Sequence, residues 1–313
     1  MHERVYRQFE SICGRMPVSD ITKQHVIQFM DALLADGKTP ENTNVILSRL
    51  RTLLNFAANK GLASAHVAKG VAVIDNRKKR GKRREWFLSE LDALFCSPVY
   101  THDMRPAGGC GEAAYWLPLL ALYTGARQTE LGQLHPEDVA QETYVLPDGS
   151  ERSAWVIRIV ENEERGQYVK NEGSERRVPV HADLIGLGFL EVADAARRAK
   201  RERIFHEIRP GAHSELMGNW SKWFGRYRRA IGVDGRATPF HAFRNSFKHY
   251  ASLCRIDAQT SGEITGHESG DVGTTVYRGL SYPLAPLVEG IALYRVPGIK
   301  LPAPPPEVRA RRE

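Results

Sequence analysis

The stretch T-G-A-R-Q-T-E-L occupies positions 124–131 and directly follows an apolar run, Glu112–Tyr123, that has helical spacing. Its glycine predicts a turn between that run and the start of a new helix. Arg127 would then lie at a helix start, where its guanidinium and nearby backbone N–H groups can meet one phosphate. An arginine there can equally form a surface ion pair, for instance with Glu130. The stretch alone leaves both roles open.

Three further motifs follow along the chain. His241 and Arg244 are three positions apart, on neighbouring positions of one helix face, and such a pair can hold a phosphate and move a proton. A histidine that caps a helix beside an exposed arginine is the equal alternative. His267, preceded by a glycine, comes 23 positions after Arg244, and Tyr277 comes ten positions later. A tyrosine taken alone is more often a buried aromatic residue than a nucleophile.

The four motifs together resemble the tyrosine recombinase (phage-integrase-like) family in order, wording and spacing. That family also uses a lysine on a β-hairpin, and the stretch V-K-N-E-G-S-E-R-R-V-P at positions 169–179 is similar to it, which makes Lys170 the matching lysine. The sequence departs from the family at Asn245, where a histidine is common, and at Ser261–Thr265, where a leucine-rich turn is typical. Neither departure removes a catalytic group.

The resemblance implies a site-specific DNA recombinase or integrase. Such an enzyme cleaves and rejoins DNA strands through a 3′-phosphotyrosyl intermediate, here at Tyr277, without metal or ATP. Two arginines would neutralise the phosphate, the lysine would protonate the leaving 5′-oxygen, and the first histidine would handle the tyrosine proton. No cofactor is expected, and the expected catalytic residues are Arg127, Lys170, His241, Arg244, His267 and Tyr277.

The resemblance also implies partners. The implied partners are double-stranded DNA as the substrate, three further copies of the chain in a homotetramer on DNA, and an accessory DNA-bending or directionality protein. Integration or excision of a mobile element and resolution of chromosome dimers would all use this chemistry. Because the chain begins almost directly with the clamp domain, arm-type DNA binding is not expected.

The fold class expected is mainly α with a small antiparallel β-sheet. With 313 residues, 42% of them hydrophobic, the chain is long enough for about two domains. Residues 1–76 are expected to form a bundle of four or five helices, one of which begins with Thr39 as N-cap and Pro40 as first-turn proline. The resemblance implies that this bundle is a SAM-like DNA-clamp domain. Residues 85–296 would be the α+β catalytic domain, and the proline-rich residues 297–313 a disordered tail.

A basic segment at positions 77–84 separates the two domains. The net charge of the chain is +7, and seven basic residues in this segment account for the whole excess. Such a cluster favours phosphate contacts through counterion release, although a solvated loop is the alternative. The residues expected to bind DNA in this linker are Arg77, Lys78, Lys79, Arg80, Lys82, Arg83 and Arg84.

Within the second domain, the pattern changes from helical to alternating between residues 144 and 180. Strands are expected at Tyr144–Leu146, Trp155–Val160 and Arg176–Val180, with Asp148-Gly149 as a turn between the first two. Helices are expected before and after these strands in the sequence. The apolar segment Leu284–Tyr294 can pack on its own domain or dock on a neighbouring subunit.

Other classes of protein are disfavoured. The cysteines are widely spaced, so neither a disulfide framework nor a zinc ribbon fits, and a site at Cys96, His102 and Cys110 matches no ligand template. No metal is therefore expected. The sequence lacks a run long enough for a membrane helix and a signal-peptide pattern, so we expect a cytoplasmic, nucleoid-associated protein.

Two competing functions stay open. A type IB topoisomerase would use the same nucleophile to relax supercoils alone, and a catalytically silent DNA-binding accessory protein would bind without cleaving. The presence of all six expected groups argues against the second alternative, and the clamp domain together with the wording of the motifs argues against the first.

Overall fold

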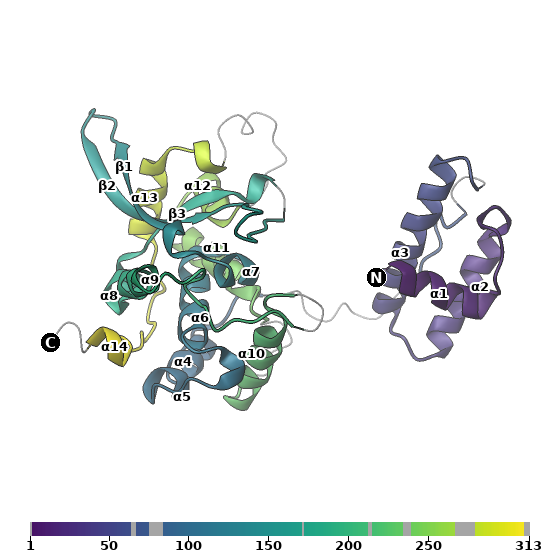
Figure 1. The fold of residues 1–313 in the computed structure, drawn as a ribbon, viewed down its shortest axis with the longest axis horizontal. Helices are drawn as coiled ribbons and strands as arrows, with labels where there is room; N and C mark the ends of the chain where they lie inside the picture. Colours follow the sequence, from purple (N-terminus) through teal and green to yellow (C-terminus); the bar gives the residue numbers. More distant parts are fainter. Residues whose placement is uncertain are drawn as a thin grey trace. The chain divides into compact units, whose positions relative to one another are not determined.

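The computed structural model describes residues 2–63, 67–74, 84–170, 172–211, 215–233, 239–266 and 279–309. The chain divides into two compact units, Met1–Arg80 and Gly81–Glu313 (Figure 1). The expected limits of the domains and of the linker stay predictions, because residues 75–83 lie outside the described part.

The first unit is helical. Its elements among the described residues are α1 (His2–Cys13), a short 3-10 helix (Val18–Asp20), α2 (Lys23–Ala35) and α3 (Pro40–Asn59). Helix α3 begins as predicted, because the side chain of Thr39 accepts a hydrogen bond from the backbone N–H of Asn42 and Pro40 opens the first turn. The apolar faces of the three helices form one core around Phe9, Phe29 and Leu50.

The described part of this unit holds three α-helices and one 3-10 helix, and the module of four or five helices stays a prediction. Residues 67–74 form a turn and an extended segment instead of a helix. The side chain of Arg51 donates to the carbonyl oxygens of Ala68 and Val71, and Asn44 exchanges two hydrogen bonds with the backbone of Val73. These side chains from α3 satisfy the backbone groups that a further helix would have paired internally.

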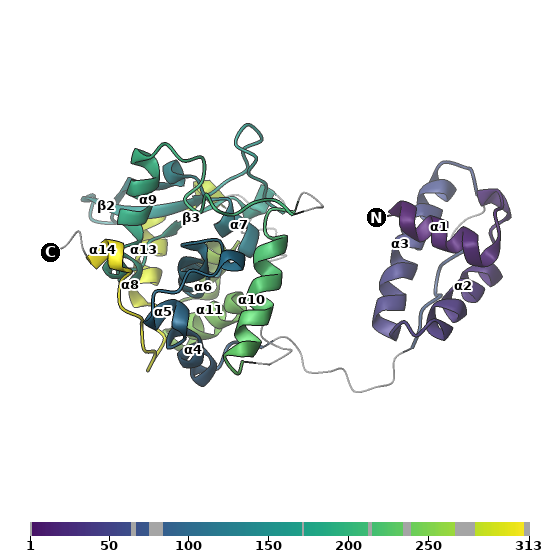
Figure 2. The same cartoon turned by 60° about the horizontal axis from the view of Figure 1, so that its bottom comes forward.

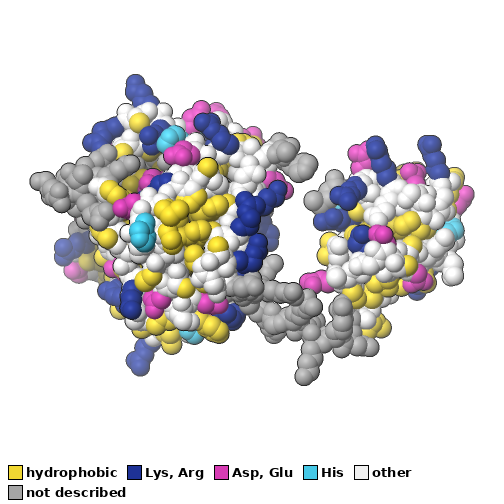
Figure 3. Space-filling view, turned by 90° about the horizontal axis from the view of Figure 1, so that it is seen from below, with side chains coloured by type: hydrophobic (Ala, Val, Ile, Leu, Met, Phe, Trp, Pro, Cys, Tyr) yellow, Lys and Arg dark blue, Asp and Glu magenta, His cyan; other side chains and the backbone are white. Residues whose placement is uncertain are grey.

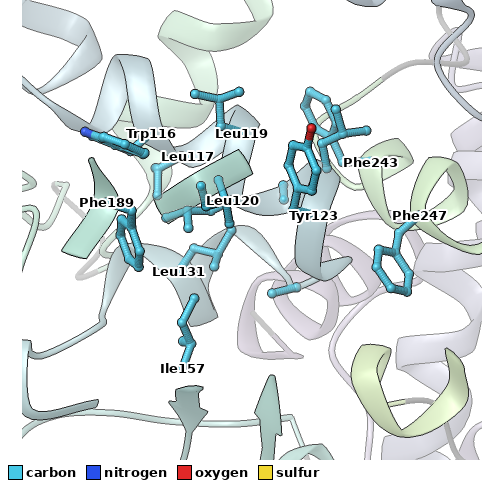
Figure 4. Close-up of a cluster of buried hydrophobic side chains, with 14 of the residues drawn as sticks. Trp116, Leu117, Leu119, Leu120, Tyr123, Leu131, Ile157, Phe189, Phe243 and Phe247 are labelled. Atoms are coloured by element: carbon cyan, nitrogen blue, oxygen red, sulfur yellow. The ribbon is translucent and has the colours of Figure 1, made fainter. Parts of the chain in front are cut away.

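The second unit is built around α6 (Ala113–Thr124), in which all twelve residues are buried. A helix that is apolar on every side needs neighbours all round, and Figures 1 and 2 show α6 inside the unit with other helices about it. Figure 4 shows side chains of α6 such as Trp116, Leu120 and Tyr123 among Phe189, Phe243 and Phe247 of the surrounding helices. The other helices are α4 (Leu88–Phe95), α5 (Pro98–Thr101), α7 (Gln128–Gly132), α8 (Ala182–Leu187), α9 (Phe189–Arg198), α10 (Gly218–Ala230), α11 (Ala242–Leu253), α12 (Ala258–Thr265), α13 (Leu284–Leu293) and α14 (Pro306–Arg309).

A three-stranded antiparallel sheet completes this unit. The strands β1 (Val139–Val145), β2 (Glu151–Ile159) and β3 (Arg176–Pro179) lie in the order β1-β2-β3. Ile157 of β2 pairs with Val139 on one side and with Val178 on the other. The expected fold class, mainly α with a small antiparallel sheet, is confirmed.

The lower face of the second unit carries both apolar and basic side chains. Figure 3 shows a hydrophobic patch on this face with Lys and Arg side chains beside it. Helix α10, which runs along the lower part of the unit in Figure 1, exposes Lys222, Arg226 and Arg229. A basic helix surface of this kind suits contact with an anionic partner.

The C-terminal part of the chain packs on its own unit. Helix α13 buries Leu284, Leu287 and Ile291 against α12 and the sheet. The expectation of a disordered tail from residue 297 is wrong as far as Arg309: the hydroxyl of Tyr115 donates to the carbonyl oxygen of Ala303 at 2.7 Å, and Val308 is buried in the space beside Gly188. A proline-rich segment can dock in extended form because it has few N–H groups to satisfy.

Among the residues that the structure describes, no helix is long and apolar enough to cross a membrane. The same residues include no group of three or more His, Cys, Asp or Glu side chains placed to hold a metal ion.

Candidate active site

Arg127 is placed by the turn that ends α6. Gly125 is in the left-handed region at φ +61, and a Cβ atom there would lie 2.7 Å from Cγ2 of Thr265, so a glycine is required. The hydroxyl of Thr124 accepts from the backbone N–H of Ala126 and supports the turn. Arg127 follows in an extended conformation as the residue that precedes α7.

Glu130 holds Arg127 in place from the first turn of α7. Its carboxylate accepts from the backbone N–H of Arg127 at 2.8 Å and from Nη1 of the same residue at 2.5 Å. Its second partner is Arg176 of β3, whose Nη2 lies 2.8 Å from Oε2. Burial alone would raise the pKa of Glu130, but the charge of Arg176 and hydrogen bonds from both arginines hold this pKa at about 2. The carboxylate is therefore ionised at neutral pH.

Arg244 lies in the first turn of α11 and is buried. Its Nη1 donates to the carbonyl oxygen of Gly125 at 3.0 Å, and its Nη2 donates to the carbonyl oxygen of Gly266 at 2.9 Å. Gly266 ends α12 in the left-handed conformation. Arg244 therefore joins the turn before Arg127 to the turn before position 267.

The site has an excess of positive charge. Glu130 is the carboxylate that both Arg127 and Arg176 contact, while the described hydrogen bonds of Arg244 go to carbonyl oxygens. Burial lowers the pKa of Arg244 to about 10, and repulsion by Arg176 and Arg127 contributes to this shift. A bound anion would relieve this repulsion, and planar guanidinium groups suit the oxygens of a phosphate.

His241 directly precedes α11 and is exposed, three positions before Arg244. The carbonyl oxygen of His241 accepts from the backbone N–H of Arg244 at 3.2 Å. The predicted H-x-x-R pair thus shares one helix start, with the histidine at the surface and the arginine inside.

Lys170 lies in the connection between β2 and β3, in a bend, with an exposed side chain. The connection is fixed before and after this residue. The side chain of Gln133 exchanges two hydrogen bonds with the backbone of Tyr168, and the hydroxyl of Ser174 accepts from Nη1 of Arg127 at 3.3 Å. Lys170 therefore lies on a segment that contacts the arginine cluster, and among the described contacts none joins its own side chain to that cluster.

Two of the six expected catalytic residues, His267 and Tyr277, lie outside the described residues. The residues that flank their segment are well fixed. Gly266 accepts from Arg244, as given above, and the backbone N–H of Gly279 donates to Oε2 of Glu263 at 3.1 Å. Both ends of the segment therefore belong to the same region as the arginine cluster.

The linker residues Arg77, Lys78, Lys79, Arg80, Lys82 and Arg83 also lie outside the described part, and Arg84 alone among the seven is described. Its guanidinium forms an ion pair with Glu90 at 2.6 Å and stacks over the ring of Phe87 at 3.6 Å. Arg84 is thus bound to its own unit. DNA binding by the linker stays a prediction.

The sequence motifs assign no role to Arg176, which is 1% exposed and makes three hydrogen bonds at the centre of the site. One signal was available. Arg176, Val178 and Val180 alternate along an expected strand, and all three are buried. A charged residue on the inward face of a strand requires a buried partner, and Glu130 is that partner.

Comparison with known proteins gives structural neighbours only. No family model matches the sequence, and no curated protein matches it. The chain is similar to a lambda integrase (75–356) dimer bound to a COC′ core site, with 20% identity, 86% of this chain and 84% of that chain covered, and a TM-score of 0.54. It is similar to the Tn1549 transposon integrase (82–397, Y379F) in complex with transposon right end DNA, with 13% identity, coverage of 85% and 84%, and a TM-score of 0.54. A third neighbour is a lambda integrase tetramer bound to a Holliday junction, with 18% identity, coverage of 87% and 69%, and a TM-score of 0.55.

These likenesses extend over most of the chain. At identities of 20% or less they concern the fold. The protein has the fold of the integrases of the tyrosine recombinase family.

Proposed function

We propose that this protein is a site-specific DNA recombinase that cleaves and rejoins DNA strands through a 3′-phosphotyrosyl bond at Tyr277. The observation that carries the proposal is the convergence of Arg127 and Arg244 in a cluster with excess positive charge. Phosphoryl transfer needs charge neutralised on the equatorial oxygens and the reacting atoms placed in line. Two guanidinium groups held by the fold supply the first of these needs.

The roles of His267 and Tyr277 rest on the resemblance in motif order. The described chain on either side of their segment supports the proposal. The carbonyl oxygen of Gly266 accepts from Arg244, and the backbone N–H of Gly279 donates to Glu263.

In the proposed reaction, the hydroxyl oxygen of Tyr277 attacks the scissile phosphorus and the bond to the 5′-oxygen breaks. His241 takes the proton of the tyrosine, Lys170 gives a proton to the departing 5′-oxygen, and His267 donates a hydrogen bond to a phosphate oxygen. The new phosphotyrosyl bond keeps the energy of the phosphodiester. A 5′-hydroxyl from another strand can then attack it, which rejoins the DNA without ATP.

Double-stranded DNA is the proposed substrate, in keeping with the DNA-bound neighbours. The basic linker residues would bind phosphates through counterion release. A homotetramer on DNA is proposed because one neighbour is a tetramer bound to a Holliday junction. The context would be integration or excision of a mobile element, or resolution of chromosome dimers.

The test is a cleavage assay on DNA that flanks the protein's own gene. The protein is mixed, without metal or ATP, with duplexes that carry a nick near each candidate site, so that a cleaved strand loses a short fragment and the covalent complex is trapped. A covalent protein–DNA adduct confined to one sequence supports the proposal. Binding without an adduct would contradict it, and so would relaxation of arbitrary supercoiled plasmid, the behaviour of a type IB topoisomerase.

A further inference from the structure

Arg176, the first residue of β3, has almost no contact with solvent, since its side chain is 1% exposed. The three nitrogen atoms of its guanidinium donate to three separate segments of the chain. Nη2 donates to Glu130 at 2.8 Å, Nη1 donates to the carbonyl oxygen of Ser174 at 2.7 Å, and Nε donates to the carbonyl oxygen of Ile264 at 2.8 Å. One planar guanidinium therefore ties together α7, the β2–β3 connection and the end of α12.

Each of these contacts leads to a group of the proposed reaction. Glu130 binds both the backbone and the side chain of Arg127. Ser174 contacts Arg127 and belongs to the same connection as Lys170. Ile264 is two residues before Gly266, whose carbonyl oxygen accepts from Arg244. Arg176 itself is buried behind these groups, where it has no access to a substrate.

Arginine suits this position because its five N–H groups point outward in one plane. Gly266 leaves room for that plane, since a Cβ atom there would lie 2.9 Å from Nη1 of Arg176. A lysine would keep the positive charge but presents a single ammonium centre, so it cannot reach three acceptors that surround a guanidinium.

We propose that Arg176 is a positioning residue for strand cleavage, which holds Arg127 through Glu130 and keeps the end of α12 in register with Arg244. The proposal rests on the proposed recombinase function. It assigns to Arg176 a part in the rate of the chemical step and no part in DNA binding.

The electrostatics of the cluster agree with this role. Arg176 is the main opposing charge that keeps the pKa of Glu130 low against its burial, and a neutral Glu130 would lose its ion pair with Arg127. Burial is the largest cause that lowers the pKa of Arg244, and the charge of Arg176 is the next largest. Arg176 thereby adds to the positive potential at the place where the phosphate would bind. The residue thus shapes both the geometry and the charge of the site.

The adjacent residue on β3 offers a matched control. Arg177 has the same kinds of partners, a carboxylate in Glu142 and a carbonyl oxygen in Tyr282, but these belong to the sheet and to the segment before α13. Because successive residues of a strand point to opposite faces, Arg177 is outside the cluster. R176K and R177K therefore remove the same chemistry from the two faces of one strand.

The experiment uses the nicked duplexes that trap the covalent complex. On them it measures the rate of covalent adduct formation for the full-length wild type, R176K and R177K. Each variant is assayed at saturating DNA and over a DNA titration, and its thermal unfolding midpoint is recorded. We expect the rate of R176K at saturating DNA to fall at least tenfold, with the half-saturating DNA concentration within about twofold of wild type. We expect R177K to cleave within about twofold of the wild-type rate at a comparable unfolding midpoint.

Three results would overturn the inference: a folded R176K that cleaves at the wild-type rate, equal losses of rate in R176K and R177K, or a defect of R176K that lies only in DNA binding. Should R176K fail to fold, E130Q decides, because it keeps Arg176 and removes the charge and one of the two acceptor oxygens that link it to Arg127. A wild-type cleavage rate for E130Q would then reject the role. A wild-type protein that forms no adduct on any DNA would instead remove the proposed function, which separates the two failures.

Discussion

Arg244 donates a hydrogen bond of 3.0 Å to the carbonyl oxygen of Gly125, a residue 119 positions earlier in the chain. This bond brings the H-x-x-R motif onto the turn that presents Arg127. The turn is also packed tightly, because Gly125 faces Thr265 at the end of α12. The geometry of the site thus depends on a glycine that carries no reactive group.

Replacement of Gly125 by alanine should be more destabilising than the same change at an open left-handed glycine. Gly149 is the control, since its φ is +82 and no atom lies within 4 Å of an added Cβ, so G149A should cost about 1–2 kcal/mol from backbone strain alone. G125A adds the clash with Thr265 and should cost about 1–3 kcal/mol more. Chemical denaturation measures both, and equal losses would contradict the packing described for the turn.

Substitution of Arg127 by alanine should slow strand cleavage by about 10²–10³-fold, in line with the loss of one preorganised donor to a developing charge. The fold should survive, because Glu130 keeps its ion pair with Arg176. R158A is a suitable control, since Arg158 pairs with Glu142 on the sheet and is 42% exposed. A cleavage rate of R127A close to that of R158A would exclude Arg127 from the reaction.

The assignment of Lys170 as general acid predicts rescue by a better leaving group. K170A should cleave ordinary DNA about 10²–10⁴-fold more slowly than the wild type. On DNA with sulfur in place of the bridging 5′-oxygen, most of the loss should vanish, because a thiol with a pKa of about 8.5 departs without a proton. R127A should stay slow on the same DNA. If K170A is equally impaired on both substrates, Lys170 has another role.

The ionised state of Glu130 should appear in the pH dependence of stability. Its pKa falls to about 2 in the folded protein from an ordinary value near 4.5. A lowered folded pKa gives stability that is present above the unfolded pKa and is lost as the pH falls toward the folded pKa. The contribution is on the order of 3 kcal/mol at neutral pH and should disappear between about pH 4.5 and pH 2.

The variant E130Q lacks this titration, so the difference in unfolding free energy between wild type and E130Q should shrink as the pH falls through that window. E151Q, which changes an exposed glutamate on β2, should follow the wild-type curve. A wild-type–E130Q difference that stays constant down to pH 2.5 would mean that Glu130 is not held ionised by its arginines.

Local signals in the sequence predicted much of the fold. Helix α3 began where Thr39 and Pro40 indicated, and the turn at Asp148-Gly149 lies between β1 and β2. The start of β1 was missed because Gln141 and Glu142 have little strand preference of their own. They pair with Trp155 and Ala154 of β2, and this pairing places them in the sheet.

The docking of the tail and the interior of the site were also harder to predict, because they too depend on pairing between residues that are distant in the sequence. Val308 is buried beside Gly188, and Arg176 is buried between Glu130 and Ile264, so each depends on partners far away in the sequence. The motif order indicated Arg127 and Arg244, and the structure brings both into one cluster. Their anchoring through Glu130 and Gly125 required the folded chain.

The most direct test of the central claim is to identify the residue that becomes bound to DNA. The trapped adduct is digested with protease and nuclease, and the modified peptide is sequenced by mass spectrometry, with Y282F as a control for loss of a nearby tyrosine. We predict a nucleotide joined through its 3′-phosphate to Tyr277. Y282F should form the adduct in normal yield, and Y277F should form none. An adduct on any other residue, or one that persists in Y277F, would contradict the account.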